Sequence, residues 1–231
     1  MSKKALLNPS YRNRIGYHTA LLGGMAFIFS AMVALGNNST KDAIKQRLKE
    51  DMQASLQQVL PATIYDNQPL EDILPLKLPK TEEKTLTIYR ARMAGKITGV
   101  AYQVVSTTGY AGPINIIMGI DNKGKLLGVR VISHTETPGL GDKIEAAKSD
   151  WITHFTGLSL KNPPPDKWKV KKDGGVFDQF TGATITPRAV VKAIKHGLVI
   201  FQEHQHEILD DSSSTISPTS YLKSINIQRM G

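Results

Sequence analysis

The sequence predicts an α+β protein with an antiparallel or mixed sheet flanked by helices, preceded by one N-terminal transmembrane helix. Three observations lead to this fold class. A charge-free apolar stretch of about 20 residues, long enough to cross a bilayer, begins at Ile15. Runs of β-branched and apolar residues separated by polar turns fill the middle of the chain. Two long stretches with apolar residues at helical spacing lie on either side of those runs.

The apolar stretch over residues 15–35 is expected to be a retained membrane span. No acidic residue occurs before Asp42, whereas four basic residues precede the span: Lys3, Lys4, Arg12 and Arg14. This asymmetry places the amino terminus in the cytoplasm and everything after about Asn37 on the outer side. A cleaved signal peptide is the alternative, but the stretch is longer than a typical secretory h-region.

The order of elements after the span suggests a stalk followed by one domain. Apolar residues recur every four positions over residues 40–60, which predicts an amphipathic helix, and Pro61 ends it. Further prolines indicate a loop-rich passage as far as residue 84. We therefore expect a short N-terminal segment (1–14), the span (15–35), a stalk helix with linker (36–84), the main domain (85–208) and a flexible tail (209–231).

Four strands are predicted within the main domain, at 85–90, 97–106, 115–120 and 126–133. The last two form a hairpin around the polar turn Asp121-Asn122-Lys123-Gly124. Helices are predicted over 144–155 and 188–206, and short strands over 168–171 and 176–179.

Composition excludes several classes of function. The formal net charge is +9, but four of the positive charges precede the span, and no basic run with interleaved aromatic residues follows. Nucleic acid is therefore not an expected partner. The chain has no cysteine, which excludes disulfides, iron–sulfur clusters and thiol catalysis. His204 and His206 fall on different helix faces, so no metal site is expected. His134 and Glu136 could form an acid–base pair, yet no nucleophile accompanies them.

The residues from Asp178 to Thr184, Asp-Gln-Phe-Thr-Gly-Ala-Thr, form the most informative motif. At the start of a predicted helix, the hydroxyls of Thr181, Thr184 and Thr186 surround two small residues, Gly182 and Ala183. Thr186 is predicted to cap this helix and Pro187 to take its first position. Backbone amides at a helix start can hold a phosphate, and a neighbouring hydroxyl could carry one covalently. Taken alone, the Thr-Pro pair is better explained by an ordinary helix cap, whereas the whole of Asp178 to Thr184 is a more restrictive pattern.

A second loop follows the hairpin directly, from His134 to Gly141. Its glycines and proline allow close backbone approach, and its tip offers an apolar surface with a few polar neighbours, as a flat aromatic cofactor requires. The residues expected to line such a site are Glu136, Thr137, Gly139 and Leu140. Tyr110, in the Gly-Tyr-Ala-Gly segment, is a further candidate. A tight turn that ends a hairpin is the alternative interpretation.

Together these two motifs resemble the G-subunit family of the Rnf (Rsx) ion-translocating electron-transport complexes. The Asp-x-x-Thr-Gly-Ala-Thr pattern resembles the flavinylation motif of their FMN-binding domains, and the Glu-Thr-Pro-Gly-Leu-Gly loop resembles the segment that lines the flavin. The resemblance implies one FMN, bound covalently through a phosphodiester to Thr184. A family-typical serine is replaced by Thr181, which adds a second possible acceptor.

The same resemblance implies partners and a location. A separate flavin transferase would attach the cofactor from FAD, and other subunits of a membrane electron-transport complex would exchange electrons with it. The chain would be a single-pass inner-membrane protein with its flavin domain in the periplasm, and an electron carrier rather than a stand-alone enzyme. Two alternatives stay open: the FMN-carrying C subunit of a sodium-pumping NADH:quinone reductase, and a membrane-anchored assembly module without redox function.

Overall fold

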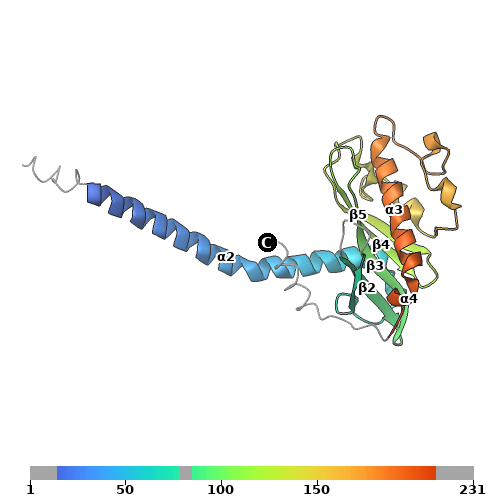
Figure 1. The fold of residues 1–231 in the computed structure, drawn as a ribbon, viewed down its shortest axis with the longest axis horizontal. Helices are drawn as coiled ribbons and strands as arrows, with labels where there is room; N and C mark the ends of the chain where they lie inside the picture. The colour runs from blue at the N-terminus through green and yellow to red at the C-terminus, as the bar shows by residue number, and fades with distance from the viewer. Residues whose placement is uncertain (1–14, 79–84, 212–231) are drawn as a thin grey trace, which may run out of the picture. The chain divides into compact units, whose positions relative to one another are not determined.

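A computed structural model describes residues 15–78 and 85–211 of the chain (Figure 1). The predictions for residues 1–14, for the end of the linker and for most of the C-terminal tail lie outside the described residues. The chain divides into two compact units, residues 1–51 and 52–231, which are described separately.

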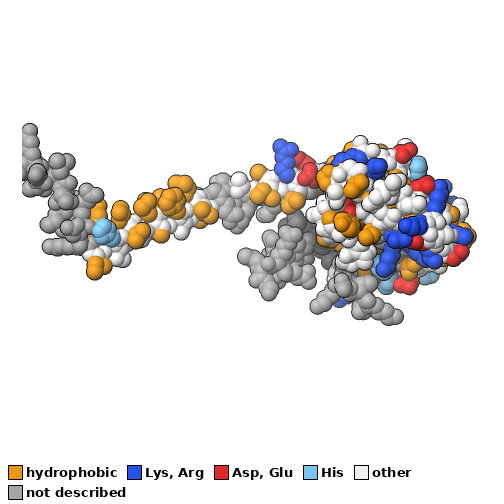
Figure 2. Space-filling view, turned by 90° about the horizontal axis from the view of Figure 1, so that it is seen from above, with side chains coloured by type: hydrophobic (Ala, Val, Ile, Leu, Met, Phe, Trp, Pro, Cys, Tyr) orange, Lys and Arg blue, Asp and Glu red, His pale blue; other side chains and the backbone are white. Residues whose placement is uncertain are grey.

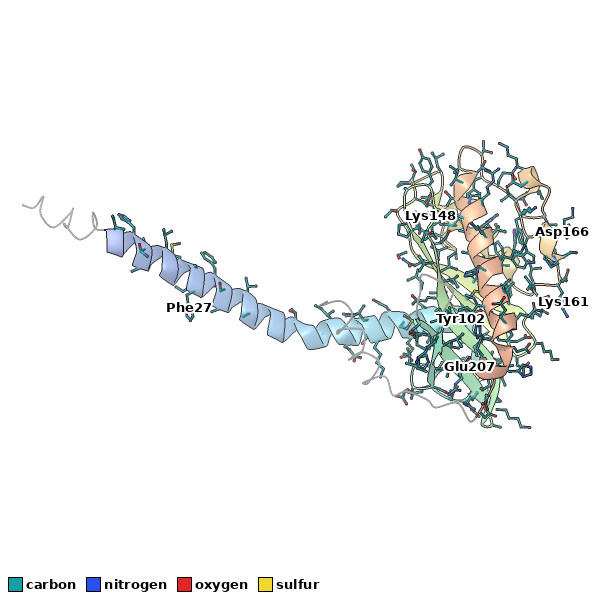
Figure 3. All side chains as sticks on the ribbon, in the orientation of Figure 1. Phe27, Tyr102, Lys148, Lys161, Asp166 and Glu207 are labelled. Atoms are coloured by element: carbon teal, nitrogen blue, oxygen red, sulfur yellow. The ribbon has the colours of Figure 1, made fainter. Side chains whose placement is uncertain are left out.

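The first unit consists of a helix, α2, whose full extent is Ile15–Val59. Its first 20 residues, Ile15–Ala34, are long and apolar enough to cross a membrane, and none of them is buried by the protein. Large apolar side chains such as Phe27, which is 75% exposed, project outward along this stretch (Figures 2 and 3). A helix that is apolar all round is suited to lipid, which agrees with the predicted span. The prediction of a separate stalk helix from residue 40 is wrong in one respect, because α2 runs from Ile15 to Val59 without a break.

The second unit is built on a five-stranded sheet in the order β1-β2-β3-β4-β5, with every neighbouring pair antiparallel. The strands are β1 (Ile73–Lys77), β2 (Thr85–Met93), β3 (Lys96–Ser106), β4 (Ile114–Asp121) and β5 (Leu126–Ser133). The antiparallel sheet and four of its strands are thus confirmed. β1 is absent from the prediction, because the prolines of its segment indicate a loop.

The two faces of the sheet are covered by different helices. On one face lies α3 (Ile185–Glu203), whose apolar residues pack on alternate side chains of β3 and β4 (Figure 1). On the other face, the last turn of α2 contributes Leu56 and Val59 to a smaller core, and Leu60, the residue after the helix, joins them. Tyr102 is fully buried beneath α3, and its hydroxyl donates a 2.8 Å hydrogen bond to the carbonyl of Gly197 (Figure 3). Burial raises the pKa of Tyr102, so this hydroxyl stays protonated and keeps donating.

The remaining elements differ from the sequence-based expectation. The helix expected over 144–155 is instead two 3₁₀ helices, η3 (Asp142–Ile144) and η4 (Trp151–Phe155). The final helix begins earlier than predicted and is followed by a separate short helix, α4 (Gln205–Ile208). The two predicted short strands are reduced to one bridge between Val170 and Phe177. Three further 3₁₀ helices are present: η2 (Ala62–Ile64), η5 (Pro165–Lys167) and η6 (Lys171–Asp173).

An aromatic cluster supports the segment that leads to α3. The rings of Phe155 and Phe177 stack with centroids 4.6 Å apart, and Trp151 meets Phe180 edge to face at 5.2 Å. The indole nitrogen of Trp151 also donates a 2.9 Å hydrogen bond to the carbonyl of Asp178. These contacts fix the chain on the near side of the threonine motif.

Candidate functional site

The threonine motif forms a tight turn that runs directly into α3. The amide of Ala183 donates to the carbonyl of Phe180 at 3.1 Å, closing the turn. Gly182 has φ +81°, in the left-handed region where a side chain would be strained. The glycine of the motif is therefore required by the backbone. Thr181 is exposed on this turn, whereas Thr184 is half-buried at its end.

Thr184 occupies the N-cap position of α3, and its side chain makes no cap hydrogen bond. Thr186, the predicted cap, lies inside the first helical turn instead and is 1% exposed. The helix starts at Ile185, so that Pro187 takes its third position rather than its first. The first amides of this 19-residue helix thus lack a side-chain cap, and they carry the partial positive charge that attracts anions.

Glu136 lies beneath this helix start rather than on the surface. It is 4% exposed, and its Oε2 accepts a 2.5 Å hydrogen bond from the Thr186 hydroxyl. Its Oε1 accepts a 3.2 Å hydrogen bond from the amide of Ala111. The carboxyl group therefore joins the Gly-Tyr-Ala-Gly segment, the second loop and α3 from inside the protein.

The tip of the second loop adjoins the threonine turn. The amides of Leu140 and Gly141 both donate to the carbonyl of Thr137, at 3.2 and 3.1 Å, and Gly139 has φ +79°. Leu140 is 45% exposed, and its Cδ2 atom lies 3.5 Å from where a side chain on Gly182 would begin. The two motifs are thus brought together by folding, with an exposed apolar side chain beside the threonine turn.

Two of the predicted residues, Tyr110 and Asp178, have exposed side chains whose polar contacts among the described residues do not include the threonine turn. Tyr110 is 69% exposed, next to the residue whose amide contacts Glu136. The side chain of Asp178 is 62% exposed and pairs with Lys171 at 2.6 Å, in the preceding segment. His134 does not pair with the carboxyl group of Glu136. Its Nδ1 accepts from the Glu136 amide at 3.0 Å, and its Nε2 lies 2.8 Å from Glu145.

A charged network that the sequence did not reveal closes the base of the second loop. Lys148 Nζ donates to Asp142 and to Glu145, each at 2.9 Å (Figure 3). Hydrogen bonding from Lys148 is the main reason that the pKa values of both carboxyl groups are lowered, and the pKa of Lys148 is raised in turn. With His134, which also contacts Glu145, this network ties the start of the loop to its end. The three-residue spacing of the charged residues is the only signal that could have indicated it.

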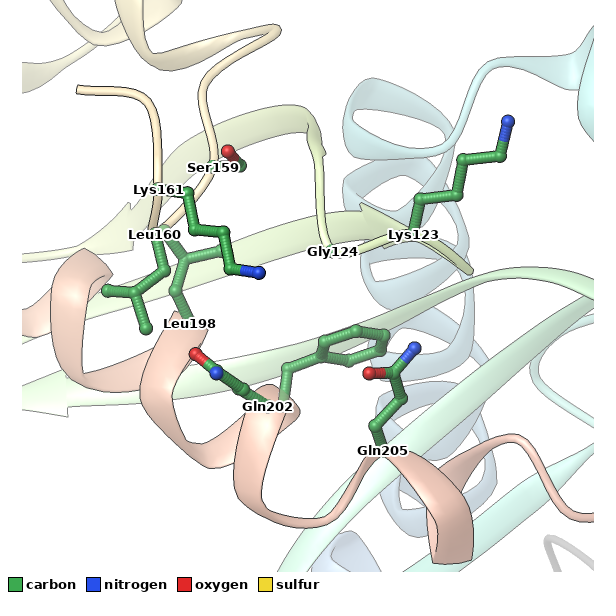
Figure 4. A pocket seen from close by; sticks show the side chains of 9 residues that line it. Lys123, Gly124, Ser159, Leu160, Lys161, Leu198, Gln202 and Gln205 are labelled. Carbon is green, nitrogen blue, oxygen red and sulfur yellow. The ribbon is translucent and has the colours of Figure 1, made fainter. Parts of the chain in front are cut away.

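A small cavity lies elsewhere, near the C-terminal end of α3 (Figure 4). Its volume is about 150 Å³, and its lining includes Lys123, Lys161, Leu198, Phe201, Gln202 and Gln205. Ligand pockets for molecules of cofactor size usually span about 300–1,000 Å³. Leu198 is also about 21 Å along the helix from Thr184, at about 1.5 Å per residue. This cavity is therefore not a candidate for a flavin ring.

The arrangement around Thr184 fits a phosphorylated aromatic cofactor held at the surface. The Thr184 hydroxyl has no capping role, and the helix start behind it lacks a side-chain acceptor. Leu140 supplies an exposed apolar contact next to the turn. Asp142, just beyond Leu140, has a buried Oδ1 atom without a hydrogen-bond partner among the described residues.

Comparison with known proteins gives consistent results. Residues 109–199 match the FMN-binding domain family, and this range contains every residue named above for the site. The G subunit of the ion-translocating oxidoreductase complex from Cereibacter sphaeroides is 49% identical over 189 residues, 82% of this chain and 85% of the relative. The corresponding G subunits of Stutzerimonas stutzeri and Pseudomonas aeruginosa are 47% and 43% identical, covering 86% and 88% of this chain and 86% and 96% of the relatives.

A solved structure also aligns with the chain. The C subunit of the Na⁺-translocating NADH-quinone reductase from Parabacteroides distasonis covers 69% of this chain and 94% of its own, with a TM-score of 0.46 and 17% identity.

Proposed function

Because the chain belongs to the G-subunit family of ion-translocating oxidoreductase complexes and contains an FMN-binding domain, we propose that it relays electrons through one FMN joined covalently to Thr184. The observation that carries the proposal is the position of Thr184. It stands at the start of α3 without a capping role, two residues after Gly182, and Gly182 lies against the exposed Leu140.

The three threonines of the motif are not equivalent as acceptors. Thr186 is buried, and its hydroxyl is committed to Glu136. Thr181 is accessible but precedes the left-handed Gly182, whereas the N-cap position next to the first helix amides belongs to Thr184. Only Thr184 combines an uncommitted hydroxyl with those amides, which would stabilise the negative charge of a phosphodiester.

Attachment requires a donor that this chain does not supply. A flavin transferase would bring FAD, and the Thr184 oxygen would form a bond to the phosphorus of its FMN half. The pyrophosphate bond to that phosphorus breaks, AMP leaves, and the threonine proton passes to a base of the transferase. No oxidant or reductant is consumed.

Once attached, the isoalloxazine ring supplies one- and two-electron redox chemistry. The residues of this chain would hold the phosphodiester at the α3 start and offer Leu140 as an apolar contact to the ring. A covalent bond suits a domain on the periplasmic side of the inner membrane, because a dissociated flavin would be lost there. The open surface around Leu140 would let other subunits of the complex approach.

The proposal is tested by co-expressing the full chain with a flavin transferase and measuring intact and peptide masses. An addition of FMN minus water should appear on the peptide that contains Thr184. Thr184→Ala should abolish it without unfolding the domain, since removal of one poorly bonded hydroxyl costs little stability. Thr181→Ala is the matched control and should retain the flavin. Finding the addition on Thr181 or Thr186, or none at all with an active transferase, would falsify the assignment.

A further inference from the structure

We infer that Glu136 and Thr186 form a buried positioning pair, which holds the acceptor Thr184 and the Leu140 loop in the arrangement required for flavin attachment. The inference rests on the proposed function. It assigns to these two residues a role beneath the site rather than contact with the cofactor.

The first line of evidence is that the two carboxyl oxygens of Glu136 accept hydrogen bonds from two different chain segments. Oε2 accepts the Thr186 hydroxyl at 2.5 Å, and Oε1 accepts the Ala111 amide at 3.2 Å. Glu136 and Thr186 are 4% and 1% exposed, so little water can replace either partner. Buried polar groups require their hydrogen bonds. The carboxyl group therefore specifies how three chain segments lie relative to one another.

The second line of evidence is that the backbone makes room for this carboxyl group. A Cβ atom at Gly109 would lie 2.8 Å from Oε1, and one at Gly141 would lie 2.9 Å from Oε2. The Gly141 Cβ would also approach the Thr186 hydroxyl to 2.9 Å. Such distances are far below normal carbon–oxygen contact, so Gly141 leaves the space that the pair occupies. At Gly109 a Cβ would meet the Gly112 carbonyl oxygen first, at 2.2 Å, and the Glu136 carboxyl group second.

The third line of evidence is the route from this buried pair to the half-buried acceptor, Thr184. Thr186 follows Thr184 by two residues in the same helical turn, and the carbonyl of Thr184 accepts the Arg188 amide at 3.4 Å. No side chain caps the helix. The hydrogen bond from Thr186 to Glu136 thus anchors the first turn from inside, which leaves the Thr184 hydroxyl available.

The same residue also fixes the apolar side of the site. Glu136 lies in the loop that carries Leu140, and Leu140 lies against the turn at Gly182. Without the pair, the acceptor and the loop could shift relative to each other. A misplacement of about 1 Å can slow a reaction by on the order of 10²-fold.

The experiment measures the rate of covalent loading of the full chain by a flavin transferase with excess FAD. Thr186→Val and Glu136→Ala should lower kcat by about 10- to 100-fold, with a smaller change in KM for the protein substrate. Thr186→Ser keeps the hydroxyl and should load at nearly the wild-type rate. Glu136→Gln should also recover most of the rate, because its amide can donate to Thr186 while its carbonyl accepts from Ala111.

Two controls separate positioning from a general loss of stability. Ile120→Val removes one buried methyl group from the sheet, away from the site, and Thr156→Val changes an exposed threonine. Both should load normally, even if the Tm of Ile120→Val falls as far as that of Thr186→Val. The midpoint potential of any flavin that loads should shift in Thr186→Val and stay unchanged in both controls.

The possible failures are distinguishable. If wild-type protein acquires no FMN on Thr184, the proposed function is wrong and the inference falls with it. If the wild type loads and Thr186→Val loads equally fast, the inference alone is wrong. It is also wrong if the loading rate simply follows Tm across the variants and controls. If Glu136→Ala does not fold, the comparison of Thr186→Val with Thr186→Ser decides.

Discussion

At the start of α3, Thr181, Thr184 and Thr186 carry the same side chain in three different surroundings. Thr181 is exposed on a turn, Thr184 is the N-cap residue of α3, and Thr186 is buried against Glu136. The exposure and hydrogen bonding of each hydroxyl therefore depend on its backbone position, because the residue type is the same. The buried hydroxyl has the strongest hydrogen bond but cannot be reached by an enzyme.

Leu140 gives a prediction at the same scale. Leu140→Glu should alter the absorption spectrum and lower the midpoint potential of the attached flavin, because a carboxylate beside the ring disfavours added electrons. Covalent attachment should persist, since the acceptor hydroxyl belongs to another segment. Visible spectra and a redox titration measure both effects.

The matched control for that change is Ile132→Glu, which replaces another exposed apolar residue, on β5. It should leave the spectrum and the potential unchanged. If a folded Leu140→Glu protein has wild-type spectra and potential, Leu140 does not contact the ring.

The sequence indicated which segments come together at the start of α3 better than it indicated where their side chains point. The threonine motif and the glycine-rich loop stood out because both resemble segments of one family, and the structure places these two segments next to each other. The helix, however, starts two residues before Pro187, and a shift of two residues turns a side chain by about 200°. That rotation places Thr186 inside. Glu136 is equally hard to predict, since a carboxyl group in a loop is usually exposed.

At the scale of elements, β1 shows why the sheet was predicted incompletely. Pro75 lies within this strand, and proline normally argues against a strand because it lacks an amide donor. β1 is an edge strand that pairs only with β2 among the described residues, so the missing donor can face outward. The interior strands contain alternating apolar residues and are bounded by polar turns. This is the usual strand pattern, so they were predictable.

The expected helix over 144–155 failed because burial alone does not determine helical hydrogen bonding. Its apolar residues are buried as expected, including Ile144, Trp151 and Phe155. Between them, however, the Ser149 hydroxyl accepts the Trp151 amide at 3.2 Å. Such local side-chain bonds compete with a continuous helix and favour turns.

Gly119 provides a test of how the end of α2 is seated on the sheet. A Cβ at this position would collide with the backbone carbonyl of Val59, which cannot move without lifting the helix. Gly119→Ala should therefore lower the free energy of unfolding by about 1–3 kcal/mol, as overpacking does. Chemical unfolding of the purified protein measures this change.

Gly197→Ala is the comparison on the opposite face. Its Cβ would meet the sulfur of Met118, which is the flexible end of a side chain, and alanine also favours the α3 helix. It should cost less than Gly119→Ala. The reverse order would show that α2 is not held by close backbone contact.

At the scale of the whole molecule, the distribution of charge around the span predicts the membrane topology. We predict one retained span, with the amino terminus in the cytoplasm and all residues after about Asn37 on the outer side. Four basic residues before the span and the absence of acids there provide the reason. A reporter enzyme that works only outside the cytoplasm should be active when fused after Lys80. A reporter that works only in the cytoplasm should be inactive at the same position. A mature protein that begins near Asn37 would show instead that the span is a cleaved signal.

The chain order of the elements determines when the acceptor site comes into being. All five strands lie before residue 134, and α3, which packs on one face of the sheet, is synthesised after all of them. Until α3 docks, the cover of that apolar face is incomplete and the Thr186 hydroxyl has not met Glu136. The acceptor turn thus exists only in a chain whose core is already complete. Flavin on Thr184 would therefore serve as a record of finished folding, because an incomplete copy of the protein would present no site for the transferase to modify.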